Sequence, residues 1–257
     1  MTKLDKLDIK IFADGANINE MLELEKNHLI KGFTTNPSLM KSAGVKNYKE
    51  FALNILSKIK NKPISFEVFS DDLTEIETQA EEIAKWGKNV NVKIPITNTK
   101  GQSTEEIIQK LSNKGNYSCL TKPDIKKLSN KGISCNITAI FTIEQVNTVL
   151  KVLNKNTPNI ISVFAGRIAD TGVEPNEIMK NSVEAAKINP CSEVLWASTR
   201  EIINIFQADK LGCQIITVPH DLLKKLKNID KNLINYSLET VLSFYNDAQK
   251  AGFKIKT

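Results

Sequence analysis

Short apolar segments alternate with amphipathic helical patterns along the chain. The apolar segments have the length and the flanking residues that are typical of β-strands. They cover residues 10–15, 32–36, 64–70, 90–97, 133–140, 160–166, 193–198 and 214–219. Eight strands, each followed by a helix, predict a single-domain (β/α)8 barrel over residues 1–257. An open doubly wound sheet is the alternative, and no glycine-rich nucleotide loop supports it.

The segments between the strands carry apolar residues at helical spacing. These segments are residues 47–60, 72–87, 142–155 and 199–212, and a last helix is predicted over 233–252. Asp72 and Thr142 are placed as N-caps, and Gly87 and Gly212 as C-terminal stops. Helices with one apolar face fit the outer ring of such a barrel.

The alternation of side chains along the strands separates two faces. In a barrel the outward face packs under helices and is apolar, whereas the inward face lines the lumen. Lys93 lies on the inward face of 90–97, and Asp14 and Glu67 share that orientation on their own strands. Ile137 and Ala139 are predicted to face outward. Further side chains predicted to face inward are Thr34, Asn36, Asn136, Thr138, Ser162, Phe164, Trp196 and Ser198, with Arg200 just beyond.

A lysine in a lumen of this kind suggests covalent chemistry. A structural ion pair of Lys93 with Glu67 or Asp14 is the other explanation, but desolvation of two charges offsets much of their attraction. A desolvated lysine becomes a free amine more readily and can attack a carbonyl. The resulting iminium draws electrons from an adjacent C–C bond, and two nearby carboxylates can move the protons.

Composition and charge exclude several classes of protein. With 41% hydrophobic and 25% charged residues, no apolar run long enough for a bilayer and no signal-like N-terminus, we expect a cytoplasmic globular protein without membrane partners. The net charge of +6 comes from lysines spread over helix faces, so nucleic-acid binding is not expected. Arg167 and Arg200 are the only arginines, and each follows a strand-like segment, where a planar two-donor group could bind a phosphate.

The cysteines and histidines give no metal pattern. Cys119, Cys135, Cys191 and Cys213 are scattered without a CxxC pair, and two histidines are too few for a histidine-based site. We expect free thiols in a reducing compartment, no metal and no cofactor.

One irregularity is a repeated LSNKG, at 111–115 and again at 128–132. Residues 116–132 therefore have the form of a segment copied in place. By the strand assignment this insert precedes the fifth strand, at the face of the barrel opposite the catalytic one. It is expected to be a surface elaboration or a contact for a partner subunit.

The segments GFTTNPSLM, VNVKIPIT, CNITAIFT, SVFAGRIAD and WASTR resemble the transaldolase family of class I aldolases, in that family's order and over about residues 9–220. The resemblance implies that Lys93 forms the Schiff base and Asp14 is the base for C–C cleavage. It implies that Glu67 and Thr138 hold the catalytic water. It further implies that Asn36, Asn136 and Ser162 bind the donor hydroxyls and that Arg167, Ser198 and Arg200 bind the substrate phosphate. Thr34 and Phe164 are also predicted to bind the substrate.

The expected activity is transfer of a dihydroxyacetone unit between phosphorylated sugars, in the pentose phosphate pathway, by a homo-oligomer. The related fructose 6-phosphate aldolase branch carries glutamine where Glu67 stands and tyrosine where Phe164 stands, so both residues favour transfer over release. Release of free dihydroxyacetone, a specialised sulfonated or surface-polysaccharide sugar, and a non-catalytic sugar-phosphate-binding barrel remain alternatives.

Overall fold

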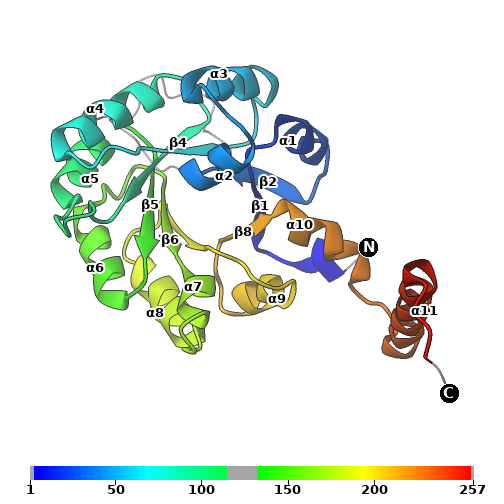
Figure 1. The fold of residues 1–257 in the computed structure, drawn as a ribbon. Coiled ribbons are helices and arrows are strands. Elements are labelled where there is room, and N and C mark those ends of the chain that lie inside the picture. Colours follow the sequence, from blue (N-terminus) through cyan, green and yellow to red (C-terminus); the bar gives the residue numbers. More distant parts are fainter. Residues whose placement is uncertain (1–2, 115–131, 256–257) are drawn as a thin grey trace.

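The computed structural model describes residues 3–114 and 132–255, whose strands form a closed parallel barrel in sequence order (Figure 1). Each strand pairs with the next, and β8 pairs with β1. The strands are β1 (Lys10–Asp14), β2 (Ile30–Thr34), β3 (Ile64–Glu67), β4 (Val90–Pro95), β5 (Cys135–Ile140), β6 (Asn159–Val163), β7 (Ser192–Trp196) and β8 (Ile215–Pro219). The predicted (β/α)8 barrel is confirmed, and the open sheet is wrong.

Helices surround the barrel, and two of them begin at the predicted caps Asp72 and Thr142, whereas the helix predicted over 199–212 covers only Ile203–Lys210. They are α1 (Ile18–Glu25), α2 (Pro37–Ser42), α3 (Tyr48–Lys58), α4 (Leu73–Ala84), α5 (Glu105–Ser112), α6 (Ile143–Val152), α7 (Ala165–Ala169), α8 (Asn176–Ala186), α9 (Ile203–Lys210), α10 (His220–Leu223) and α11 (Leu233–Ala251), with 3-10 turns η1 (Lys3–Lys6) and η3 (Lys224–Asn228). Asp72 accepts a hydrogen bond from the Glu75 N–H, and Thr142 forms a capping box with Gln145. Gly212 follows α9 with a φ of 80°, whereas Gly87 lies beyond the actual C-cap of α4, Lys85.

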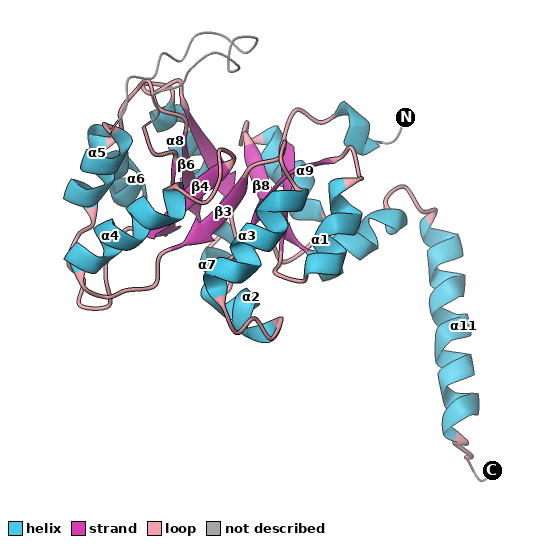
Figure 2. Cartoon of the chain, turned by 90° about the horizontal axis from the view of Figure 1, so that it is seen from above, coloured by secondary structure: helices cyan, strands magenta, loops and turns pink. Residues whose placement is uncertain are grey.

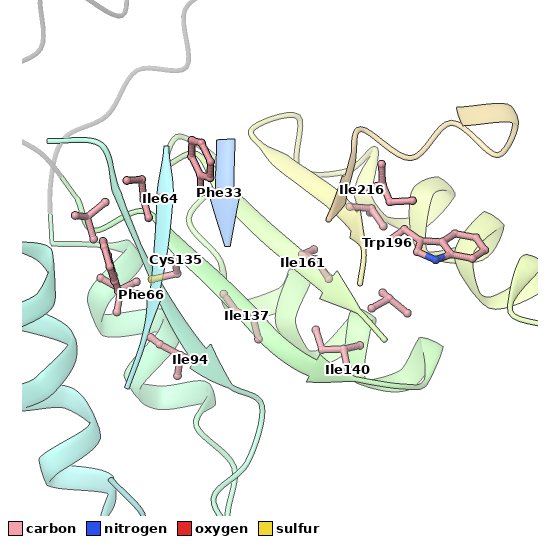
Figure 3. Close-up of a cluster of buried hydrophobic side chains, with 14 of the residues drawn as sticks. Phe33, Ile64, Phe66, Ile94, Cys135, Ile137, Ile140, Ile161, Trp196 and Ile216 are labelled. Atoms are coloured by element: carbon pink, nitrogen blue, oxygen red, sulfur yellow. The ribbon is translucent and has the colours of Figure 1, made fainter. Parts of the chain in front are cut away.

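Two apolar clusters fill the molecule. The larger one lies between the strands and the helices, and Figure 3 shows part of it, including Phe33, Phe66 and Ile137. The smaller one contains Phe12, Ile160, Leu195, Ala197 and Ile215. By strand alternation these residues face the lumen, so apolar side chains fill part of it and leave a limited space for polar groups.

The seventh strand differs from the prediction. Trp196 is 1% exposed and packs in the outer cluster (Figure 3), while Leu195 and Ala197 border the lumen cavity. Ser198 borders it as well, because its left-handed backbone, with a φ of 64°, interrupts the alternation. The prediction that Trp196 faces the lumen was therefore wrong. Both faces of this strand end are apolar, so the alternation of side chains does not show which face points inward.

The fifth strand has a similar interruption at its end. Ala139 has a φ of 58°, and the pairing of β5 with β6 shifts register between Ile137 and Ile140. Ile137 faces outward as predicted, but the next fully buried outer residue is Ile140, and Ala139 is only partly buried. A local bulge of this kind changes the direction of the strand end beside Thr138.

The C-terminal helix α11 stands apart from the barrel (Figures 1 and 2). It begins at an Asn232 cap and ends at Gly252, whose φ of 67° fits a glycine stop. None of its residues is buried, although it carries exposed Leu238, Val241 and Phe244. No helix within residues 3–114 and 132–255 is long and apolar enough to span a bilayer.

The cysteines depart in part from expectation. Cys135 and Cys213 are free and buried, and burial raises the pKa of each thiol to about 12. Cys191 is disulfide-bonded, so the expectation of free thiols throughout is wrong there. Cys119 and all but Gly132 of the predicted insert at 116–132 lie outside the described residues.

Candidate active site

A cavity of about 180 Å³ opens at the carboxyl ends of the barrel strands. This is the end where (β/α)8 barrels build their active sites, because the loops that follow the strands converge there. Most of the predicted site residues line it: Asp14, Thr34, Asn36, Lys93, Thr138, Ser162, Phe164, Arg167, Ser198 and Arg200. Glu67 and Asn136 do not line it, and each instead contacts a residue that does.

A larger hollow, of about 420 Å³, lies beside α1 and α3. It includes Asn17, Lys46, Asn47 and Glu50, and two of these asparagines serve as helix N-caps. None of the predicted catalytic side chains reaches it. The smaller cavity in the lumen is therefore the candidate active site, because most of the predicted catalytic side chains line it and none of them lines the larger hollow.

Lys93 lies in β4 at the centre of this convergence and is only 7% exposed. Its Nζ is 3.0 Å from Glu67 Oε2 and donates to the carbonyl oxygen of Thr35 at 3.3 Å. The pair follows from the sheet, since Glu67 and Lys93 are register partners on β3 and β4. A buried amine with one carboxylate beside it has a proton acceptor in place, which is what an amine nucleophile requires.

Asp14 ends β1 and lines the same cavity. Burial raises the pKa of its carboxyl, while the charge of Lys93 and the hydrogen bond from Thr34 lower it. Thr34 Oγ1 donates to Asp14 Oδ1 at 2.7 Å and also contacts the hydroxyl of Thr217. A carboxylate that is desolvated and held in one orientation is suited to act as a general base.

A chain of polar groups runs behind the lysine. Asn136 donates to Ser65 Oγ at 3.0 Å and accepts from Ser162 Oγ at 2.6 Å, and it is fully buried. Its role is therefore to hold Ser162 at the cavity wall. Thr138 Oγ1 is buried and has no hydrogen-bond partner among the described residues, so it is available to a ligand or a water. Ser65 was not predicted, because a serine in a strand gives no signal of its own.

Asn36 has a structural function besides its place at the cavity. It is the N-cap of α2, and its Oδ1 accepts from the Leu39 N–H at 2.9 Å. Only the Nδ2 group of Asn36 therefore remains to donate to a ligand. The Pro37 that follows is favoured in the first turn of a helix, so the TTNP segment fixes this orientation locally.

Tyr48 is a second contact that the sequence did not reveal. Its hydroxyl accepts from the Glu67 N–H at 2.8 Å and donates to the Glu67 carbonyl at 2.9 Å. Burial raises the pKa of the Tyr48 phenol, so it remains a neutral donor. Its ring lies against Phe66 and Trp86. Tyr48 thereby fixes the end of β3, and with it the carboxylate beside Lys93.

The two arginines lie at the mouth of the cavity with different partners. Arg167 lies 5.5 Å from the centre of the Phe164 ring, a cation–π contact. Arg200 pairs with Asp170 through Nε at 3.1 Å and through Nη2, and the hydrogen bond lowers the pKa of Asp170. Helix α7, which carries Arg167, is in close contact with the segment that carries Arg200, because a Cβ on Gly166 would lie 1.6 Å from the Ser198 carbonyl oxygen. Only glycine fits there.

Within the described part of the chain, no three His, Cys, Asp or Glu side chains are grouped so that they could hold a metal ion.

The chain is similar to several known proteins. The family model described as Transaldolase/Fructose-6-phosphate aldolase matches residues 11–256. A protein of Thermoanaerobacter sp. (strain X514) named "Probable transaldolase" is 32% identical over 248 residues, covering 96% of this chain and 100% of the relative. One of the same name from Streptococcus agalactiae is 30% identical over 243 residues, with 94% and 100% covered. The solved structure of KGPDC from Streptococcus mutans superimposes with a TM-score of 0.54 at 9% identity, over 82% of this chain and 88% of that one, and shows the shared fold alone.

Proposed function

Because the chain belongs to the transaldolase/fructose-6-phosphate aldolase family, we propose that it is a transaldolase acting through a Schiff base on Lys93. It would move a dihydroxyacetone unit from a ketose phosphate to an aldose phosphate. The observation that carries the proposal is the buried Lys93 amine, 3.0 Å from Glu67 and in one cavity with Asp14. A buried amine beside two carboxylates is suited to addition to a carbonyl, whereas its contribution to stability is small because desolvation of the charges offsets much of their attraction.

The first half of the reaction uses Lys93 and Glu67. Glu67 accepts a proton from the Lys93 ammonium group, and the neutral amine adds to the carbonyl carbon of the donor. A proton moves from the nitrogen to the oxygen, which gives a carbinolamine. Glu67 then returns its proton to the carbinolamine hydroxyl, which leaves as water and forms the iminium. The unpartnered hydroxyl of Thr138 supports a water-mediated proton path at this step.

The second half uses Asp14. Its carboxylate accepts the proton of the donor hydroxyl on the carbon beyond the scissile bond. The electrons of that C–C bond move to the iminium, the aldehyde product departs, and an enamine remains on Lys93. An acceptor aldehyde then reverses these steps and leaves with the three-carbon unit. Burial of Asp14 beside a cationic nitrogen fits a base that is needed only while the iminium is present.

Transfer and release are separated by one assay. Both Glu67 and Phe164, as the resemblance implies, favour transfer over the release of free dihydroxyacetone. We expect fructose 6-phosphate to be consumed quickly only when an aldose phosphate such as erythrose 4-phosphate is present. Equal consumption without an acceptor, with free dihydroxyacetone as product, would place the chain with the aldolase branch. If only a sulfonated or surface-polysaccharide sugar were consumed, the enzyme would be a specialised transaldolase.

Arg200 gives a prediction for substrate binding. The proposed phosphate site consists of Arg167, Ser198 and Arg200, all at the cavity wall. Arg200→Lys replaces a two-donor fork, already oriented by Asp170, with a point charge. We expect the KM for phosphorylated donors to rise about tenfold with little change in kcat. Steady-state kinetics measures this, and an unchanged KM would remove Arg200 from the site.

The proposal includes assembly of this chain with copies of itself. α11 has no buried residue, yet it exposes a row of apolar side chains that includes Leu238, Val241, Leu242 and Tyr245. An isolated helix of this length is marginal in water, so its apolar face needs a covering surface. Light scattering should give an oligomer for the full chain and a smaller particle after truncation at Asp230. A monomeric full chain would contradict the assembly.

A cytoplasmic location and a place in the pentose phosphate pathway also belong to the proposal. The free thiols of Cys135 and Cys213 are compatible with a reducing compartment, whereas the disulfide at Cys191 counts against one. Fractionation of the source cells and the sugar preference in the transfer assay test these two points.

A further inference from the structure

Tyr48 is a partly buried residue that no step of the proposed mechanism uses. It begins α3, directly after the Asn47 cap, and it does not line the cavity. Its hydroxyl accepts from the Glu67 N–H and donates to the Glu67 carbonyl. A phenol that pairs with the backbone donor and acceptor of one strand residue takes a place that a neighbouring strand normally fills.

The neighbouring strand at this point is β2. The Thr35 N–H donates to the Ser65 carbonyl at 3.1 Å, in continuation of the pairing of β2 with β3. In a parallel ladder the next bond runs back from the Glu67 N–H to the Thr35 carbonyl. The Glu67 N–H donates instead to the Tyr48 hydroxyl, at 2.8 Å. The tyrosine therefore replaces the last bond of the ladder.

The Thr35 carbonyl that this exchange releases accepts from Lys93. Lys93 Nζ is 3.3 Å from it and 3.0 Å from Glu67 Oε2. Thr35 is itself fixed, because it is fully buried and its Oγ1 donates to the Ser65 carbonyl at 2.7 Å. Two acceptors in fixed positions restrict rotation of the amine about its Cε–Nζ bond. This rotation sets the direction of the nitrogen lone pair once Glu67 has taken a proton.

Aromatic packing holds the Tyr48 ring in place. Its centroid lies 6.2 Å from that of Phe66, 5.5 Å from that of Phe69 and 5.6 Å from that of Trp86. Burial raises the pKa of the phenol, so the hydroxyl keeps the proton that it donates to the Glu67 carbonyl. Tyr48→Phe removes the hydroxyl alone and retains this packing, which makes it a specific test of the two hydrogen bonds.

Resting on the proposed function, we propose that Tyr48 is a positioning residue for the Lys93 nucleophile. Its hydroxyl takes the Glu67 N–H out of the ladder and so keeps the Thr35 carbonyl as a second acceptor for the amine. The amine is thereby held between Glu67 and Thr35 in an orientation suited to attack on a carbonyl. In Tyr48→Phe the Glu67 N–H loses its acceptor, and the Thr35 carbonyl is its ordinary ladder partner.

The test is the rate of Schiff-base formation in Tyr48→Phe, measured in a single turnover with fructose 6-phosphate as the borohydride-trapped adduct on Lys93. We expect the rate constant at saturating donor to fall about tenfold. The half-saturating donor concentration should change less than about twofold, because Tyr48 does not line the cavity.

Ser182→Ala is the matched control. It removes a fully buried hydroxyl that donates to the Ile178 carbonyl within α8 and lies outside the cavity. This variant should keep the parent rate constant even where its Tm falls as far as that of Tyr48→Phe. An equal loss of rate in Ser182→Ala would overturn the role of Tyr48, because any lost buried hydrogen bond would then have the same effect.

The remaining outcomes separate this role from the proposed function. Formation of the adduct by Tyr48→Phe at the parent rate constant, whatever its Tm, would overturn the role of Tyr48 and leave the proposed function standing. If the parent protein forms no adduct with any ketose, the proposed function fails and this inference fails with it. Should Tyr48→Phe not fold, Tyr48→His replaces it, because an imidazole can still make one hydrogen bond. A smaller loss of rate is then expected, and the parent rate constant again overturns the role.

Discussion

Lys93→Met is expected to abolish transfer, with a loss of at least about four orders of magnitude in kcat/KM. Methionine has a similar length and no nucleophilic amine, so neither carbinolamine nor iminium can form on β4. Lys93 is only 7% exposed and pairs with Glu67. No other lysine among the described residues pairs with that carboxylate, so none is placed to replace it. The measurement is donor consumption with and without acceptor.

The control for this substitution is another lysine on a strand. Lys10 begins β1 and pairs with Glu193, and Lys10→Met should retain transfer. Lys93→Met also leaves the Glu67 carboxylate without its cation, and an unpaired buried charge costs about 3–5 kcal/mol. Adding Glu67→Gln removes that charge, so the double variant should regain stability and remain inactive. Turnover in either Lys93 variant would refute the covalent mechanism.

Asp14→Asn is expected to reduce C–C cleavage about 10²- to 10⁴-fold, the usual contribution of a general base. The asparagine can still accept the hydrogen bond from Thr34 that orients Asp14. The Schiff base does not depend on Asp14, so the variant should accumulate the uncleaved donor adduct.

Two measurements separate these steps. Intact mass after borohydride reduction should show the whole six-carbon donor on the Asp14→Asn protein, because bond cleavage no longer follows addition. A three-carbon adduct formed at the parent rate would mean that another group is the base. Complete absence of an adduct would assign Asp14 to the first half of the reaction instead.

Much of the barrel follows from local patterns. Alternating apolar and helical segments and the caps at Asp72 and Thr142 predict the order of elements, because those signals act within a few residues. Lys93 could be singled out for the same reason, because it lies between Val92 and Ile94 in the sequence and its side chain points to the opposite face of the strand from theirs. Parallel pairing then brings Glu67 beside it.

The errors and omissions have a different origin. Trp196 was assigned to the wrong face because its strand is apolar on both sides and because the left-handed Ser198 interrupts the alternation. Tyr48 contacts Glu67, and Asp170 contacts Arg200, from segments far apart in sequence. No local pattern marks such residues, and only the folded barrel brings them to the site.

Borohydride trapping with fructose 6-phosphate, followed by intact mass and peptide mapping, is the decisive measurement for covalent catalysis by Lys93. We expect a reduced three-carbon adduct on Lys93 and none on Lys93→Met. An adduct formed only with another ketose would preserve the mechanism and change the substrate. If the folded protein forms no adduct with any ketose, Lys93 does not form a Schiff base and is only the structural partner of Glu67.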